Sequence, residues 1–437
     1  MSDVRIAESA RPLTGALEAD LTASGAPESG TTTLAGLFRD MNPTERRTLW
    51  ACVLGYVLDG LDFTIYTLVL GTVIAMWNVD RGTAGLTVTA TLLCSAVGGW
   101  AAGLLSDRIG RVRTLQITVL WFSLFSLLSA VAQSFGQLAV CRALLGLGFG
   151  GEWTAGAVLM GETIRPRLRG RAVGCVQAGW AVGWGSAVLV QAIFYTLLPA
   201  QIAWRWMFAL GFVPALYVIF VRRFVQEPPI AAAARTSSGR VLDIFSRDII
   251  KTTALAALLG TGAQGGYYAI NTWLPIFLQT ERHLTVVGST SYLAFLISGA
   301  LTGYLVGAWL ADRIGRRNLF LLFSVSAIVV VLAYTQIPMS NDVLWVLGFP
   351  LGFVASGYYS GLGAFFTELF PTRVRGSAMG FAYNCGRGIG ALFPTLVGFL
   401  SAKMALSHAI AIFAVVAYSL MFVAAVLLPE TRGRQLA

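Results

Sequence analysis

Long apolar stretches alternate with short polar segments along this chain of 437 residues. An apolar helix of about 20 residues crosses the hydrocarbon core of a bilayer, where backbone polar groups must pair within the helix. The pattern therefore predicts twelve membrane-spanning helices. They lie near residues 48–76, 86–106, 113–133, 137–163, 172–198, 205–222, 251–278, 288–311, 318–337, 343–369, 377–400 and 406–428.

The chain repeats itself once, about halfway along. The segment Asp107-Arg108-Ile-Gly110-Arg111 returns 205 residues later as Asp312-Arg313-Ile-Gly315-Arg316. A second signature returns 206 residues later, with Glu162, Arg169, Gly170 and Gly174 matched by Glu368, Arg375, Gly376 and Gly380. Two distant signatures with almost the same offset indicate a duplicated half. Two homologous hydrophobic halves are typical of a secondary transporter, which binds its substrate between them.

This organisation predicts an all-α membrane protein, with twelve transmembrane helices in two pseudo-symmetric six-helix bundles. We expect the bundles at residues 45–225 and 249–430, joined by a cytoplasmic linker at 226–248 that contains Pro228-Pro229. Residues 1–44 are expected to form a disordered cytoplasmic tail, and 431–437 a short second tail. The N-terminus lacks a basic region followed by an apolar run, so we expect no cleaved signal peptide.

The composition agrees with a membrane protein and argues against nucleic acid as a partner. The chain is 56% hydrophobic and 12% charged, with a mean hydropathy of +0.71, whereas soluble domains carry about 25% charged residues. The net charge of +10 arises because most of the 31 Lys and Arg residues fall in alternate loops. This asymmetry predicts that both termini and the central loop face the cytoplasm of a bacterial-type inner membrane.

Neither a metal nor a cofactor is expected. The five cysteines fall in apolar segments without metal-ligand spacing, and they are interpreted as small buried hydrophobes. The glycine run Gly146-x-Gly148-x-Gly150-Gly151 superficially resembles a phosphate-binding loop, but no strand precedes it. The sequence also offers no nucleophile–base pair, so we do not expect an enzyme.

Several motifs resemble those of a known transporter family. The duplicated Asp-Arg-x-Gly-Arg loops and Arg142-x3-Gly146-x-Gly148 resemble the signatures of the major facilitator superfamily. Four further segments resemble the sialate:proton symporters and, as near relatives, the aromatic-acid:proton symporters. These are Leu58-Asp59-Gly60-Leu61-Asp62-Phe63, Gly148-x-Gly150-Gly151-Glu152, Gly179-Trp180-Ala181-Val182-Gly183, and Gly380-Phe381-x-Tyr383-Asn384 with Pro394.

Three carboxylates and one arginine are candidates for proton coupling. Asp59 and Asp62 lie about a dozen residues into helix 1, close to the predicted midplane, and their i,i+3 spacing places them on one face. Glu152 lies midway along helix 4, and Arg142 lies near the outer end of the same helix. A buried charge must pair or face a cavity. For each residue, a structural ion pair therefore remains open beside a role in carrying the proton.

Arg387 is the candidate for binding an anionic substrate. It lies about eleven residues into helix 11, which by the resemblance flanks the central cavity together with helices 2, 5 and 8. Its planar guanidinium matches a carboxylate, although an ion pair with Asp59, Asp62 or Glu152 remains the alternative. The other candidate lining residues are aromatic or amide: Tyr66, Gln177, Trp180, Trp184, Gln264, Tyr267, Tyr268, Asn271, Trp273, Tyr358, Tyr359, Tyr383 and Asn384.

The repeated loop motifs are expected to form charge networks that hold the two halves together on the cytoplasmic side and act as a gate. Their members are Asp107, Arg108, Arg111, Glu162, Asp312, Arg313, Arg316 and Glu368.

The sequence thus predicts a monomeric, proton-coupled importer of a small organic anion, with an aromatic or other small carboxylate favoured. The aromatic-acid relatives carry a basic residue at the position of Arg387, which favours that class over a sugar acid. Helix 5 lacks the Gly-Pro-x2-Gly-Gly pattern of drug antiporters, which favours import. Uptake of a sugar acid, lactone or monocarboxylate, efflux or exchange on the same fold, and a non-transporting membrane sensor remain alternatives.

Overall fold

The computed structural model describes residues 39–164, 166–224, 244–371 and 374–432. The chain divides into the units Met1–Met41 and Asn42–Ala437. Only residues 39–41 of the first unit are described, and the second unit contains all the helices considered below. The expected disordered tail over 1–44, linker over 226–248 and tail over 431–437 fall largely outside the described residues, so these boundaries stay predictions.

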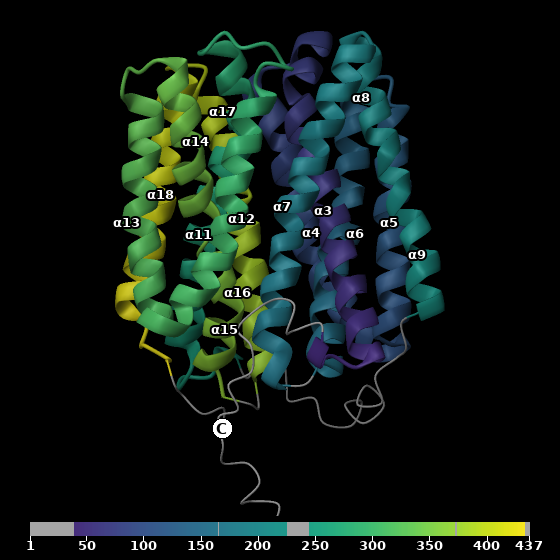
Figure 1. Ribbon diagram of the computed structural model, residues 1–437, viewed down its shortest axis with the longest axis vertical. Coiled ribbons are helices and arrows are strands. Elements are labelled where there is room, and N and C mark those ends of the chain that lie inside the picture. The colour runs from purple at the N-terminus through teal and green to yellow at the C-terminus, as the bar shows by residue number, and fades with distance from the viewer. Residues whose placement is uncertain (1–38, 165, 225–243, 372–373, 433–437) are drawn as a thin grey trace, which may run out of the picture. The chain divides into compact units, whose positions relative to one another are not determined.

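The first half of the chain forms six spans (Figure 1). They are α3 (Pro43–Trp77), α4 (Arg81–Ile109), α5 (Arg111–Ala130), α6 (Phe135–Thr163), α7 (Pro166–Leu197), and a sixth span of α8 (Ala200–Ala209), the 3-10 turn η1 (Leu210–Phe212) and α9 (Val213–Phe224).

The second half repeats this order. Its spans are α11 (Ile250–Thr280), α12 (Thr290–Ile314), α13 (Arg316–Gln336), α14 (Asn341–Ser356) with α15 (Tyr359–Leu369), α16 (Arg375–Gly390) with α17 (Leu392–Leu400), and α18 (Leu406–Leu427). The prediction of an all-helical chain with twelve spans is confirmed. Within the described residues, nine helical segments are long and apolar enough by themselves to cross a membrane.

Three spans expected to be continuous are interrupted. Proline explains two of the breaks, because its ring clashes with the carbonyl four residues earlier. The ring of Pro214 faces the carbonyl of Leu210, the residue at which η1 begins. The ring of Pro394 faces the carbonyl of Gly390, the residue at which α16 ends. The tenth span is interrupted at Gly357 and Tyr358.

The ends of several helices follow from local sequence signals. Asn42 and Glu45 form a capping box at α3, with Glu45 N donating to Asn42 Oδ1 at 2.8 Å and Asn42 N donating to Glu45 Oε2 at 3.0 Å. Asp80 precedes α4 and accepts bonds from the hydroxyl and the backbone N–H of Thr83. These bonds, the hydroxyl first, hold the pKa of the Asp80 carboxyl below its usual value.

The repeated glycines occupy equivalent places in the two halves. Gly110 joins α4 to α5 with φ of 103°, and Gly315 joins α12 to α13 with φ of 95°. L-residues with a side chain rarely adopt this conformation, which explains the glycine in both copies. The offset of 205 residues between the copies is therefore also a structural equivalence.

Close backbone contacts between helices repeat in the same way. A Cβ at Gly98 of α4 would meet Leu147 O of α6, and a Cβ at Gly303 of α12 would meet Phe353 O of α14. Likewise, Gly146 lies against Thr91 O, and Gly352 lies against Leu296 O. The small residues let these helices approach where lipid provides no hydrophobic drive for association.

The two halves meet along several helix pairs. Between α4 and α17, the hydroxyls of Thr89 and Thr395 lie 2.6 Å apart, and Thr89 also donates to Ala391 O. Between α7 and α11, Trp180 Nε1 donates to Tyr267 OH at 2.6 Å. This second contact lies at the wall of the cavity that follows.

Candidate functional site

A cavity lies between helices of both halves, and the empty space within it and at its opening, open solvent included, is about 480 Å³. Its wall consists of α3, α6 and α7 of the first half and α11, α12, α15 and α16 of the second. Twelve side chains line it, nine of them aromatic: Tyr56, Asp59, Phe63, Phe149, Gln177, Trp180, Tyr267, Tyr268, Tyr304, Tyr359, Tyr383 and Arg387. Arg387 and Asp59 are the two ionisable side chains of the wall other than tyrosine.

Arg387 reaches from α16 towards the first half. Its Nη1 donates to Ser95 Oγ of α4 at 2.8 Å, and its Nη2 donates to Tyr383 OH at 3.2 Å. The guanidinium carbon lies 5.6 Å from the centre of the Phe149 ring and 5.0 Å from that of Tyr383. The side chain is 5% exposed, Nε has no hydrogen-bond partner among the described residues, and no described carboxylate lies within 4.0 Å of Arg387. Within the described part of the chain it is therefore a buried cation without an ion pair.

Asp59 and Glu152 form a buried acidic pair beside the cavity, and Arg387 lies within electrostatic range of Asp59. Asp59 is 1% exposed, and neither carboxyl oxygen has an aligned hydrogen-bond partner among the described residues. Glu152 is the acidic neighbour that acts most strongly on it. The Glu152 carboxyl occupies the space beside Gly55, one helical turn before Asp59, where a Cβ would collide with Glu152 Oε1. Two carboxyl groups this close in a buried site do not readily both ionise.

Asp62 and Arg142 form a separate ion pair. Arg142 Nη1 lies 3.2 Å from Asp62 Oδ2, both side chains are 1% exposed, and Ser126 donates to Asp62 Oδ1. The guanidinium carbon of Arg142 lies 5.4 Å from the ring centres of both Tyr66 and Phe208. Neither charged residue lines the cavity. This geometry matches the structural alternative considered for Asp62 and Arg142.

The aromatic side chains of the wall form one group in each half. In the first half, Trp180 lies 5.4 Å from Tyr56 and 5.7 Å from Phe63, between ring centres. In the second half, Tyr267 lies 5.9 Å from Tyr268 and 5.5 Å from Tyr359. The Trp180–Tyr267 hydrogen bond joins the two groups. Such a wall offers ring faces and edges to a flat ligand.

The structure brings part of the expected set of lining residues together. Gln177, Trp180, Tyr267, Tyr268, Tyr359 and Tyr383 share the cavity wall with Arg387. The remaining expected residues, Tyr66, Trp184, Gln264, Asn271, Trp273, Tyr358 and Asn384, do not line the cavity.

Most of these other residues bond to backbone carbonyls within the protein. Gln264 Nε2 donates to Tyr383 O at 2.9 Å, Trp273 Nε1 donates to Pro394 O at 2.9 Å, and Tyr358 OH donates to Ala263 O at 2.7 Å. Tyr66 donates to Ala84 O, Asn271 to Tyr267 O and Asn384 to Gly380 O. Their position on cavity-flanking helices did not reveal which helix face they occupy.

Sequence reasoning missed Tyr56, Phe63, Phe149 and Tyr304. A signal was present for two of them. Tyr56 and Phe63 lie three residues before and four residues after Asp59, which places all three side chains on one face of α3. Phe149 and Tyr304 carry no such signal, because their helices are apolar around most of their circumference.

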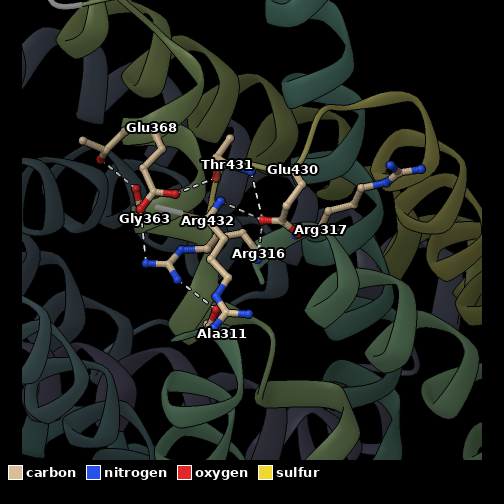
Figure 2. Close-up of polar contacts among 9 residues, drawn as sticks. Ala311, Arg316, Arg317, Gly363, Glu368, Glu430, Thr431 and Arg432 are labelled. Atoms are coloured by element: carbon tan, nitrogen blue, oxygen red, sulfur yellow. Dashed lines mark hydrogen bonds and ion pairs between the residues drawn. The ribbon is translucent and has the colours of Figure 1, made fainter. Parts of the chain in front are cut away.

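The gating candidates are described only in part. Arg316 Nη2 pairs with Glu368 Oε1 at 3.2 Å (Figure 2). Thr431 Oγ1 donates to Glu368 Oε2 at 2.5 Å, and Glu430 accepts the backbone N–H groups of Arg316 and Arg317 at 2.9 and 3.1 Å. Arg313 lies over the Trp309 ring. These contacts join α13, α15 and the segment after α18, all in the second half.

The side chains of Asp107, Arg108, Arg111, Glu162 and Asp312 lie outside the described part of the chain. The expectation that the charge networks hold the two halves together therefore stays a prediction.

Comparison with known proteins gives the family. The family model described as Major Facilitator Superfamily matches residues 52–394 and 299–436. A relative from Cupriavidus pinatubonensis named as a probable 4-methylmuconolactone transporter is 42% identical over 396 residues, covering 90% of this chain and 92% of the relative. A cis,cis-muconate transport protein from Acinetobacter baylyi is 30% identical over 363 residues, covering 80% and 86%.

A solved structure confirms the fold. The bacterial homologue of the lysosomal transporter Spinster, in an inward-facing and occupied conformation, has a TM-score of 0.71 at 18% identity and covers 89% of this chain and 98% of its own. The family resemblance predicted from the loop motifs and helix 4 is thus confirmed. This chain belongs to the major facilitator superfamily and is a multi-pass membrane transporter, not an enzyme.

Proposed function

We propose that this transporter imports a small organic anion, an aromatic or other small carboxylate, together with protons across the bacterial inner membrane. The observation that carries the proposal is Arg387, a buried cation on the cavity wall with no described carboxylate within ion-pair distance. An uncompensated charge in a buried site is costly. A substrate carboxylate supplies the missing partner in the bidentate geometry that arginine favours.

The walls and the relatives support this substrate class. Nine aromatic side chains line the cavity together with Arg387, and they suit a flat or cyclic acid better than a hydroxyl-rich sugar, which needs many polar partners. The relative named for 4-methylmuconolactone points to a small organic acid as well.

Asp59 and Glu152 are the proposed proton site. The pair lies between the cavity and the interior of the first half, and it has no described basic partner within ion-pair distance. Protonation of one carboxyl relieves the repulsion between the two groups. We propose that the proton and the substrate bind to the outward-facing form, that the halves then rock, and that both leave on the inside. A monomer with cytoplasmic termini is the proposed functional form.

The test is uptake into proteoliposomes under an imposed pH gradient, inside alkaline, with labelled aromatic, aliphatic and sugar acids. We expect accumulation of aromatic or other small carboxylates, stimulated by the gradient and lost in Arg387→Ala. Preferential uptake of sugar acids would contradict the substrate class. Accumulation that ignores the pH gradient would contradict proton coupling, and movement only outwards would establish efflux.

A further inference from the structure

The charges on the cavity wall suggest a rule for substrate selection. We infer that the cavity accepts organic monoanions and rejects acids of similar size that carry two ionised carboxylates. This inference rests on the proposed function, because it takes Arg387 as the group that receives the first carboxylate. It adds a limit on substrate charge that the proposed function does not contain.

The first step is the capacity of Arg387. A guanidinium has five N–H donors, and the structure uses one on Ser95 and one on Tyr383. The remaining donors, including the unpartnered Nε–H, suffice for one carboxylate. The same two bonds hold the guanidinium in place, so it does not swing to reach a second carboxylate at the far end of a ring.

The second step is the absence of another cation among the described lining residues. Of the twelve described side chains that line the cavity, Arg387 alone is basic. Arg142 is also buried in the bundle, but it pairs with Asp62 and stands between two aromatic rings away from the cavity. A second ionised carboxylate therefore finds no basic partner on this wall.

The third step is the acidic side of the wall. Asp59 lines the cavity, and Glu152 lies directly behind it. A substrate carboxylate that points towards this pair meets like charge, whereas one that points elsewhere meets aromatic rings. A buried charge without a partner is unfavourable in either orientation, and a carboxylate that faces the acidic pair is repelled in addition.

A limit on substrate size is a separate property from a limit on charge. The two can be tested apart with a monoanion that is longer than the diacid.

The test compares benzoate, monomethyl terephthalate and terephthalate at pH 7 by calorimetry on the purified full-length protein. The half-ester is a monoanion and is longer than the diacid, so a size limit rejects it first. We expect the half-ester to bind and terephthalate to bind about tenfold or more weakly than the half-ester. Equal affinity for the half-ester and the diacid would overturn the inference, and so would rejection of the half-ester alone.

A gain-of-function variant sharpens the test. Gln177 lines the cavity, and Gln177→Lys places a second cation on the wall. We expect this variant to reduce the discrimination against terephthalate by about tenfold or more, while Gln177→Met, of similar length and uncharged, leaves it unchanged. Thermal unfolding in detergent shows, independently of binding, that each variant is folded. If benzoate and the half-ester fail to bind the wild type, or bind Arg387→Ala equally well, the proposed function itself is wrong.

Discussion

The two halves of this transporter share their packing but differ in their buried chemistry. The shift of 205 residues that relates α4 to α12 also carries Gly55 and Gly60 of α3 onto Gly260 and Gly265 of α11. At the same shift, Asp59 corresponds to Gln264 and Asp62 to Tyr267. A shift of 206 residues, valid for α6, pairs Glu152 with Tyr358 and Arg142 with Gly348.

Each of these four buried charges of the first half therefore corresponds to a neutral residue in the second half. Arg387, the buried charge of the second half, likewise corresponds to a neutral residue, Ala181 of α7. Duplication preserved glycine contacts that set helix spacing, as at Gly98 and Gly303, since a Cβ there collides with backbone and cannot be accommodated. The ionisable positions were free to diverge because neutral side chains bury more cheaply than charged ones.

The acidic pair belongs to the first half and the Arg387 guanidinium to the second, and the cavity lies between the two halves. In the proposed mechanism, rocking of one half against the other changes the distance from the acidic pair to the bound anion. The protonation state of the pair would then bias which conformation is favoured, which is the linkage that the proposed coupling requires.

The largest expected effect comes from removing the acidic site. Asp59→Asn should abolish accumulation against a concentration gradient while sparing exchange of substrate for substrate, because the neutral amide mimics the protonated acid. Uptake and exchange assays in proteoliposomes separate the two activities. The matched control is Tyr358→Phe, which removes a hydroxyl at the position equivalent to Glu152. If Asp59→Asn and Glu152→Gln both accumulate substrate with wild-type pH dependence, the first half does not carry the proton.

The next effect concerns the cation of the second half. Arg387→Ala should weaken substrate binding by about 2–5 kcal/mol, or roughly thirtyfold to several-thousandfold. Arg387→Lys keeps the charge but loses the planar guanidinium that binds a carboxylate through two hydrogen bonds, so we expect intermediate affinity. Calorimetry measures the wild type and the variant with a substrate acid and with its neutral amide, which gives a complete thermodynamic cycle. Should the acid and the amide suffer equally from Arg387→Ala, the carboxylate binds elsewhere.

Part of this comparison could be predicted from the sequence, and part could not. Hydrophobic length and the duplicated motifs predicted the twelve spans, because lipid leaves few alternatives to a helix. Arg387 and Asp59 could be identified as cavity residues because a buried charge at the midplane needs a partner or a cavity. Asp62 meets the same criterion, however, and the sequence did not reveal that Arg142, 80 residues later, lies within 3.2 Å of it.

The residues of the cavity wall show a second limit of prediction from the sequence. Gln264 and Asn384 are polar residues on cavity-flanking helices, yet they bond to backbone carbonyls within their own half. Phe149 and Tyr304 are less conspicuous in sequence but line the cavity. Tertiary packing determines which face of a mostly apolar helix is turned towards the cavity. The hydrophobic pattern of such a helix does not indicate that face.

The Asp62–Arg142 pair tests whether every charge of the first half serves transport. Arg142→Leu leaves a buried carboxylate unpaired and should destabilise the protein by about 3–5 kcal/mol. The double variant Asp62→Asn with Arg142→Leu should recover much of this loss, because no buried charge is then left unpaired. The second half already does without this pair, since Gly348 occupies the position that corresponds to Arg142. Thermal unfolding in detergent measures both effects. A stable Asp62→Asn variant with altered pH dependence of uptake would instead assign Asp62 to the proton site.

The smallest expected effect concerns the cytoplasmic contacts of the second half. The Arg316–Glu368 pair is partly exposed, with side chains 15% and 16% accessible, and such pairs contribute about 0–1 kcal/mol. Glu368→Gln weakens the pair, and Thr431→Val removes only the hydroxyl bond to the same carboxylate. If these contacts act within one half, both variants should lower the unfolding temperature slightly and leave the inward-to-outward ratio unchanged. Spin-label distances across the two faces measure that ratio.

Asp107→Ala provides the contrasting measurement in the first copy of the motif. Asp107 belongs to the signature expected to hold the halves together, and its removal should shift the resting population towards inward-facing forms. A shift in Asp107→Ala without one in Glu368→Gln would show that the two copies of the gate have diverged, as the buried charges have. Equal shifts in both variants would show that the second-half contacts also control the orientation of the halves. No shift in Asp107→Ala would remove the first copy from the gate.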